Sequence, residues 1–85
     1  MLNVLKERLL DGMEIVKAKE KPSKYEITFL IKGVEVKTEI PKACTPGMQN
    51  RIVDDTIFNA MAQSAFKHGD VEDAGKWLDK IGRWS

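Results

Sequence analysis

The sequence contains one cysteine, Cys44, and one histidine, His68, among its 85 residues. A single cysteine cannot form an intramolecular disulfide, and cysteines and histidines are too few to hold a zinc ion. We therefore expect no metal site and no cofactor. Small secreted domains usually need disulfides or a metal for stability, so the composition favours the cytoplasm.

Long apolar runs are also missing, and neither sign of charge dominates. No segment approaches the roughly 20 apolar residues that span a bilayer, so we do not expect this chain to cross a membrane. Fourteen basic residues against thirteen acidic ones leave a net charge of +1, whereas dedicated nucleic-acid-binding domains are usually strongly basic. The hydrophobic content of 42% is enough for one core, and the length predicts a single domain over residues 1–85.

The clearest structural signal is the alternation of apolar and polar residues from 25 to 40, interrupted at Lys32-Gly33. Alternation is typical of strands with one buried face, and a two-residue loop joins such strands in a hairpin. We therefore predict strands over 25–31 and 34–40, in a register that counts outward from the loop. The predicted pairs on the buried face are Ile31–Val34, Phe29–Val36, Ile27–Thr38 and Tyr25–Ile40.

A further strand is expected over residues 13–20, joined to the hairpin by a turn at 21–24 that contains a proline. Continuing the same alternation backwards places Val16 opposite Phe29 on the buried face. It leaves Ile15 opposite Leu30 on the outer face of the sheet.

Three helices complete the pattern. Apolar spacing predicts helices over 2–11, about 46–67, and 70 to 80 or 81, the last capped by Asp70. The expected fold class is α+β: a two-layer domain in which a three-stranded antiparallel β-meander is packed on one face by helices, in the order α-β-β-β-α-α. The predicted core includes Leu5, Leu9, Val16, Ile27, Phe29, Val36, Ile57, Phe58, Met61, Phe66, Leu78 and Ile81.

The order of helix, three-strand meander and helix over residues 2–67 resembles the double-stranded-RNA-binding domain in topology. That resemblance implies phosphate contacts from a lysine-rich helix start and a contact from the loop between the first two strands. The corresponding helix start, 45–51, has only one basic residue, Arg51, and the loop at 21–24 is basic but short. The resemblance therefore carries no binding residue onto this chain.

Residues 58–81 resemble one helical hairpin of the tetratricopeptide repeat. The resemblance implies geometry only, since a solenoid needs about three repeats. It predicts two antiparallel helices that pack closely at Ala62 and Ala74. The positions that carry it are Phe58, Met61, Ala62, Phe66, Gly69-Asp70, Ala74 and Leu78.

Candidate catalytic residues are few. His68 ends a predicted helix, where a cation complements the helix dipole, and general acid–base chemistry would also need a partner and a cleft. Cys44 precedes a predicted helix start, which favours mild thiol reactivity, but a structural role is the stronger interpretation. We therefore predict that the protein is not an enzyme.

A basic cluster lies in the first strand and the turn that follows it, at Lys17, Lys19, Lys21 and Lys24. Lysines on an edge strand commonly prevent edge-to-edge aggregation. The alternative is that they contact phosphates of double-stranded RNA or DNA, with an affinity that falls steeply with salt.

The last feature is the group Trp77, Lys80, Arg83 and Trp84. Tryptophan and arginine are over-represented at interaction hot spots, although both indoles can also fold back onto the core. With balanced charge and no catalytic constellation, this group favours a small protein-interaction module: an adaptor, a regulator or an inhibitor of a larger protein. Homo-oligomerisation through the same residues is a variant of this hypothesis.

Overall fold

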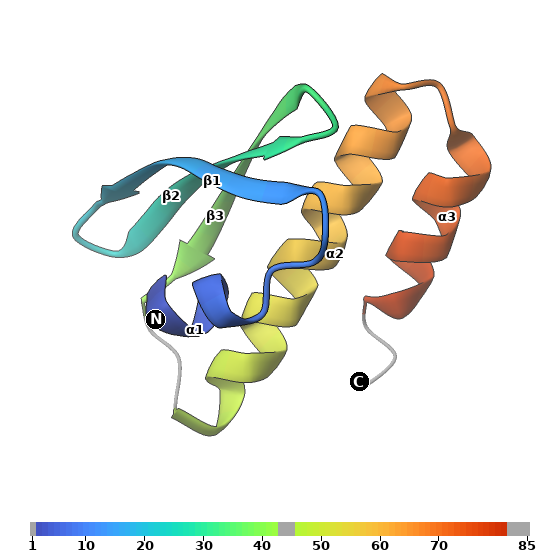
Figure 1. The fold of residues 1–85 in the computed structure, drawn as a ribbon. Helices are drawn as coiled ribbons and strands as arrows, with labels where there is room; N and C mark the ends of the chain where they lie inside the picture. Colours follow the sequence, from blue (N-terminus) through green and yellow to red (C-terminus); the bar gives the residue numbers. More distant parts are fainter. Residues whose placement is uncertain (1, 43–45, 82–85) are drawn as a thin grey trace.

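The computed structural model describes residues 2–42 and 46–81, and it shows the predicted order of elements (Figure 1). A three-stranded antiparallel sheet in the order β1-β2-β3 is packed on one face by helices. The elements are α1 (Leu2–Glu7), β1 (Met13–Glu20), β2 (Lys24–Ile31), β3 (Val34–Pro41), a 3-10 turn (Pro46–Met48), α2 (Gln49–Lys67) and α3 (Val71–Lys80).

The β2–β3 hairpin has the predicted register, with Ile31 opposite Val34 and all further pairs in step. Its two-residue loop has positive φ at both positions, +50° at Lys32 and +82° at Gly33. Two positive φ values are the mark of a type I′ turn, whose backbone twist matches the twist of the strands. The alternation and the turn therefore act together to define this register.

Strand β1 departs from the prediction because a β-bulge lies between Ile15 and Lys17. The bulge places Ile15, not Val16, opposite Phe29, and Val16 is 45% exposed. The prediction that Val16 belongs to the core was wrong. The extra residue brings Ile15 onto the buried face while Ala18 stays opposite Ile27, as predicted.

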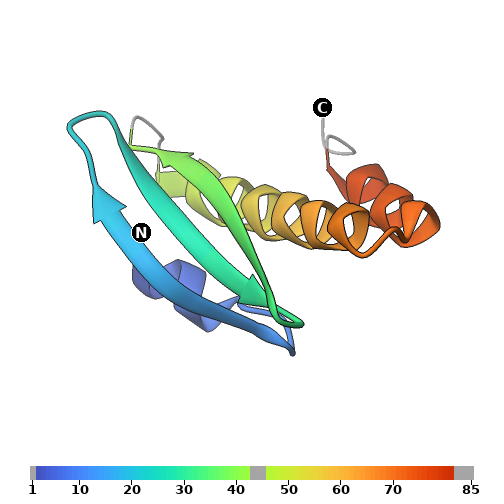
Figure 2. The same ribbon diagram turned by 90° about the horizontal axis from the view of Figure 1, so that it is seen from above.

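The helices divide the buried face of the sheet between them. Short α1 lies below the β1 side, and α2 runs along β3 (Figures 1 and 2). α1 ends four residues earlier than expected, and the chain turns into β1 through Gly12, whose φ is +86°. α3 packs chiefly on α2 and lies away from the sheet. Its N-cap is the predicted one, since the Asp70 carboxylate accepts a hydrogen bond from the Asp73 backbone N–H.

Ala62 and Ala74 are both buried, as the helical-hairpin resemblance implies, and small residues let α2 and α3 approach closely. The apolar side chains that are fully or almost fully buried include Leu5, Ile27, Phe29, Ile31, Val36, Ile40, Val53, Ile57, Ala60, Met61, Ala62, Ala65 and Ala74.

Besides Val16, five residues of the predicted core are less buried than expected. Phe66 and Leu78 are 51% and 43% exposed, so their assignment to the core was wrong. Leu9, Phe58 and Ile81 are half-buried. For the three residues in α2 and α3, the physical reason is that α2 has the sheet on one side and α3 on another, which leaves one sector of each helix uncovered. In the part of the chain that is described, no helix has the length and apolar character needed to cross a membrane.

Candidate functional site

Trp77 is held in a small aromatic cluster on the α2–α3 hairpin. Its ring stacks on Phe58 with 5.9 Å between centroids, and its Nε1–H donates to the Asp73 carboxylate at 3.3 Å. The Lys80 ammonium lies 5.7 Å from the Trp77 ring centroid and 5.9 Å from that of Phe58, within cation–π range. The structure thus brings Trp77 and Lys80 together, while Arg83 and Trp84 lie outside the described residues.

The α2–α3 hairpin also exposes three large apolar side chains, two of which, Phe66 and Leu78, belong to the predicted core. Val71 is 68% exposed, Phe66 is 51% exposed and Leu78 is 43% exposed. Phe66 lies in the last turn of α2 and Val71 in the first turn of α3. Val71 and Leu78 are seven residues apart and therefore share a helix face. Helical periodicity could have identified that face, but not that it is left uncovered.

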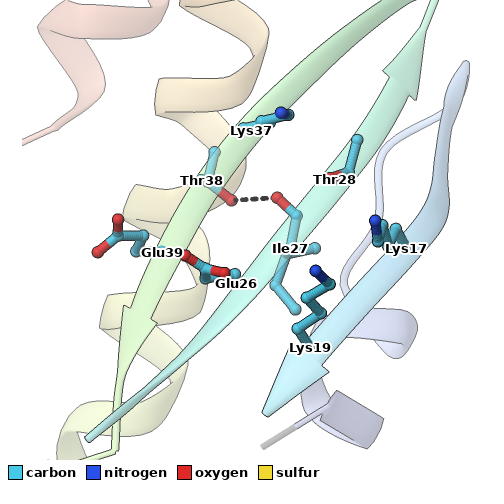
Figure 3. Close-up of a pocket in the computed structure, with 8 residues that line it drawn as sticks. All are labelled: Lys17, Lys19, Glu26, Ile27, Thr28, Lys37, Thr38 and Glu39. Carbon is cyan, nitrogen blue, oxygen red and sulfur yellow. Dashed lines mark hydrogen bonds between the residues drawn. The ribbon is translucent and has the colours of Figure 1, made fainter. Parts of the chain in front are cut away.

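The outer face of the sheet carries a second candidate site, a shallow concavity of about 240 Å³ (Figure 3). Lys17 and Lys19 reach it from β1 and Lys37 reaches it from β3. Thr28 of β2 lies between Lys17 and Lys37, because it pairs with both in the sheet. Of these three lysines, the predicted basic cluster included Lys17 and Lys19 but not Lys37. The strand register was the signal that adds Lys37.

The other two lysines of the predicted basic cluster form ion pairs. Lys21 Nζ lies 3.7 Å from Glu26, and Lys24 Nζ lies 2.7 Å from Glu39. The hydrogen bond to Glu39 raises the pKa of Lys24 above its ordinary value. Their charge offsets the two carboxylates at the concavity, so the cationic character there comes from Lys17, Lys19 and Lys37.

Another ion pair joins the end of α1 to α2, the two helices that cover the sheet. The Arg8 guanidinium donates two hydrogen bonds to the Asp54 carboxylate of α2, at 2.7 and 2.6 Å. This hydrogen-bonded pairing raises the pKa of Arg8. The pair fixes the end of α1 to α2, and we assign it a structural role.

Of the two candidate catalytic residues, the structure describes only His68. His68 is exposed at the C-terminal end of α2, where its backbone N–H bonds to Ser64 and Ala65 carbonyls. Cys44 lies outside the described residues. Within residues 2–42 and 46–81, no group of three or more histidine, cysteine, aspartate or glutamate residues is arranged to hold a metal ion.

No protein-family model matches the chain, and comparisons with curated proteins and with solved structures find no match either.

Proposed function

We propose that the protein is a small, non-enzymatic protein-interaction module whose partner contacts the α2–α3 hairpin. One observation carries the proposal: Phe66, Val71 and Leu78 are all more than 40% exposed on that hairpin. Apolar side chains exposed together on a small domain are typical of interaction surfaces. The aromatic cluster of Trp77, Phe58 and Lys80 lies on the same hairpin and supplies residue types enriched at hot spots.

The proposal is tested by affinity capture from a native lysate of the source cells, with and without nuclease. Leu78→Glu places a carboxylate on the exposed apolar face without disturbing a buried position, so it should fold. We expect it to reduce partner recovery at least tenfold, as hot-spot changes do. Lys76→Glu is the matched control, because it introduces a carboxylate two residues away on the same exposed helix.

The expected partner is a protein that survives nuclease treatment and is lost with Leu78→Glu but kept with Lys76→Glu. Trp77→Ala and Trp84→Ala extend the test to the originally predicted residues. Recovery that is the same for the wild type and Leu78→Glu would contradict the hairpin surface. Circular dichroism melts of each variant separate lost binding from lost folding.

Nucleic-acid binding is the second candidate function, and the outer-face concavity favours it. Lys17, Lys19 and Lys37 line one concavity, while the nearby Glu26 and Glu39 are offset by Lys21 and Lys24. Lysines in this arrangement suit phosphate contacts, and binding through them would weaken steeply with salt. A captured complex that nuclease or moderate salt dissolves, and that Lys17→Glu with Lys19→Glu abolishes, would favour this function over the first.

A further inference from the structure

Strand β3 forms an open edge of the sheet, since the strand order is β1-β2-β3. In an antiparallel ladder, alternate residues direct both backbone groups either to the partner strand or away from it. The hydrogen bond from the Lys42 N–H to the Ser23 carbonyl sets this alternation for the β2–β3 pair. The β3 residues whose N–H and C=O groups point away from β2 are therefore Glu35, Lys37 and Glu39.

Two of these three residues offer free backbone groups. The Glu35 carbonyl accepts a hydrogen bond from Lys67 Nζ at 2.8 Å. No described hydrogen bond reaches the edge-facing N–H and C=O groups of Lys37 and Glu39. A short row of two donors and two acceptors thus remains available for another strand.

Helix α2 extends under the space beside this edge. A helix is about 10 Å wide and strands lie about 4.8 Å apart, so one helix covers roughly two strands. Among the strands, α2 packs mainly on β3 and little on β2. Figure 2 shows α2 running out beyond the β3 edge with no strand above it. A groove of about 400 Å³ separates the edge from the helix. Its helical side includes Ile52, Asn59, Gln63 and, from the end of α3, Ile81.

The opposite edge of the sheet is less regular. The bulge between Ile15 and Lys17 interrupts the ladder of β1, and bulges are a common device that discourages pairing at an edge. Strand β3 pairs without a bulge along its whole length. The regular edge and the uncovered part of α2 therefore lie on the same side of the molecule.

We propose that the β3 edge binds an extended segment of a partner protein as a fourth, antiparallel strand. Side chains directly opposite each other in a sheet favour opposite charge. The segment would place an acidic residue opposite Lys37 and a basic residue opposite Glu39, whose carboxylate it would share with Lys24. It therefore reads basic–x–acidic from its N-terminus. Main-chain hydrogen bonds supply the affinity and the alternate side chains the specificity. This surface goes beyond the hairpin of the proposed function and does not depend on it.

The occupant is a segment of a partner and not a second copy of the whole protein. A second copy paired through β3 would bring its own α2 under the same junction, where the first α2 already lies. The same charge pattern nevertheless occurs in β3 itself. Lys37-Thr38-Glu39 itself reads basic–x–acidic, so a peptide of this sequence is a suitable probe.

The experiment titrates the full-length, ¹⁵N-labelled protein with an acetylated and amidated peptide of the sequence of residues 34–40. We expect saturable amide shifts at Lys37 and Glu39, and slower hydrogen exchange of those two amides. N-methylation of the peptide lysine removes an N–H that points to β3 and should weaken binding about tenfold. N-methylation of the peptide threonine is the matched control, because that N–H points away, and binding should persist.

A charge exchange tests the register. Exchanging lysine and glutamate in the peptide should weaken binding about threefold to tenfold. The variant with Lys37→Glu and Glu39→Lys should then prefer the exchanged peptide. Leu78→Glu on the hairpin should leave peptide binding unchanged, so this result is independent of the hairpin proposal.

Three outcomes would overturn the inference. One is the absence of β3 amide shifts at peptide concentrations up to about 5 mM, beyond the weakest useful affinities. Another is equal loss of binding on N-methylation at both positions, which would mean that the ladder is not formed. The third is a concentration-dependent shift of the β3 amides without peptide, which would make a second copy the occupant.

Discussion

Lys32 stands at a position where its backbone is strained, and relieving that strain should stabilise the fold. Its φ of +50° lies in the left-handed region, which costs an ordinary L-residue about 1 kcal/mol or more. Asparagine tolerates this region, and Asn-Gly is the preferred pair in a type I′ turn. Lys32 is exposed, so Lys32→Asn removes no buried contact. We expect the free energy of unfolding to rise by about 0.5–1 kcal/mol.

The assay is urea denaturation followed by circular dichroism, with a thermal melt beside it. For a domain of this size the gain corresponds to a rise in Tm of roughly 2–8 °C. Lys32→Gln is the control: it removes the same charge but keeps the strain, and an exposed substitution of this kind usually changes stability by less than about 0.5 kcal/mol. Equal stability of the two variants would refute the strained-turn argument.

Three other predictions test the sheet, a helix cap and an ion pair. Val16→Thr should lower the free energy of unfolding by less than about 0.5 kcal/mol, and Ile15→Thr should lower it by about 1.5 kcal/mol, as measured by urea denaturation. The reverse order would favour the register without a bulge, in which Val16 lies opposite Phe29. Asp70→Ala should destabilise by about 1 kcal/mol through loss of the N-cap, and should leave Tm unchanged if that cap is unimportant. Glu39→Gln should lower the pKa of Lys24 towards its ordinary value, as followed by ¹³C NMR titration of its side chain. Because that pKa is raised by Glu39 in the folded state, the stabilisation from the pair is present below lysine's ordinary pKa and is lost as pH rises through the raised pKa.

The β2–β3 hairpin was predictable because its information is local. The alternation of residue types and the Lys32-Gly33 loop lie within one short segment, and a slip by one residue would move a whole apolar set to solvent. In strand β1 the alternation of residue types does not determine the register in this way. Ile15 and Val16 are adjacent and both apolar, so alternation alone does not decide which of them faces the core. The bulge that decides it depends on how both ends of β1 meet β2.

The helical errors have a different cause. Periodicity shows which residues share a helix face, but it does not show what covers that face. Phe66 and Leu78 follow the apolar spacing of their helices, yet no neighbouring element covers them fully. The same limit applies to one candidate site, because the open groove beside β3 depends on the position of α2. The grouping of Lys37 with Lys17 follows instead from the predicted register, which places both residues opposite Thr28.

The peripheral position of α3 divides the protein into regions of unequal stability. α3 packs chiefly on α2, and Ala74 is its one buried residue. Elements with few buried contacts open with a smaller free energy than global unfolding requires, so the amides of α3 should exchange faster than those of β2. Opening of α3 would separate the Phe58 ring from its Trp77 partner. A partner that binds α3 would therefore be coupled to the local opening of this helix. The relevant free energy is that of the local opening and not that of global unfolding.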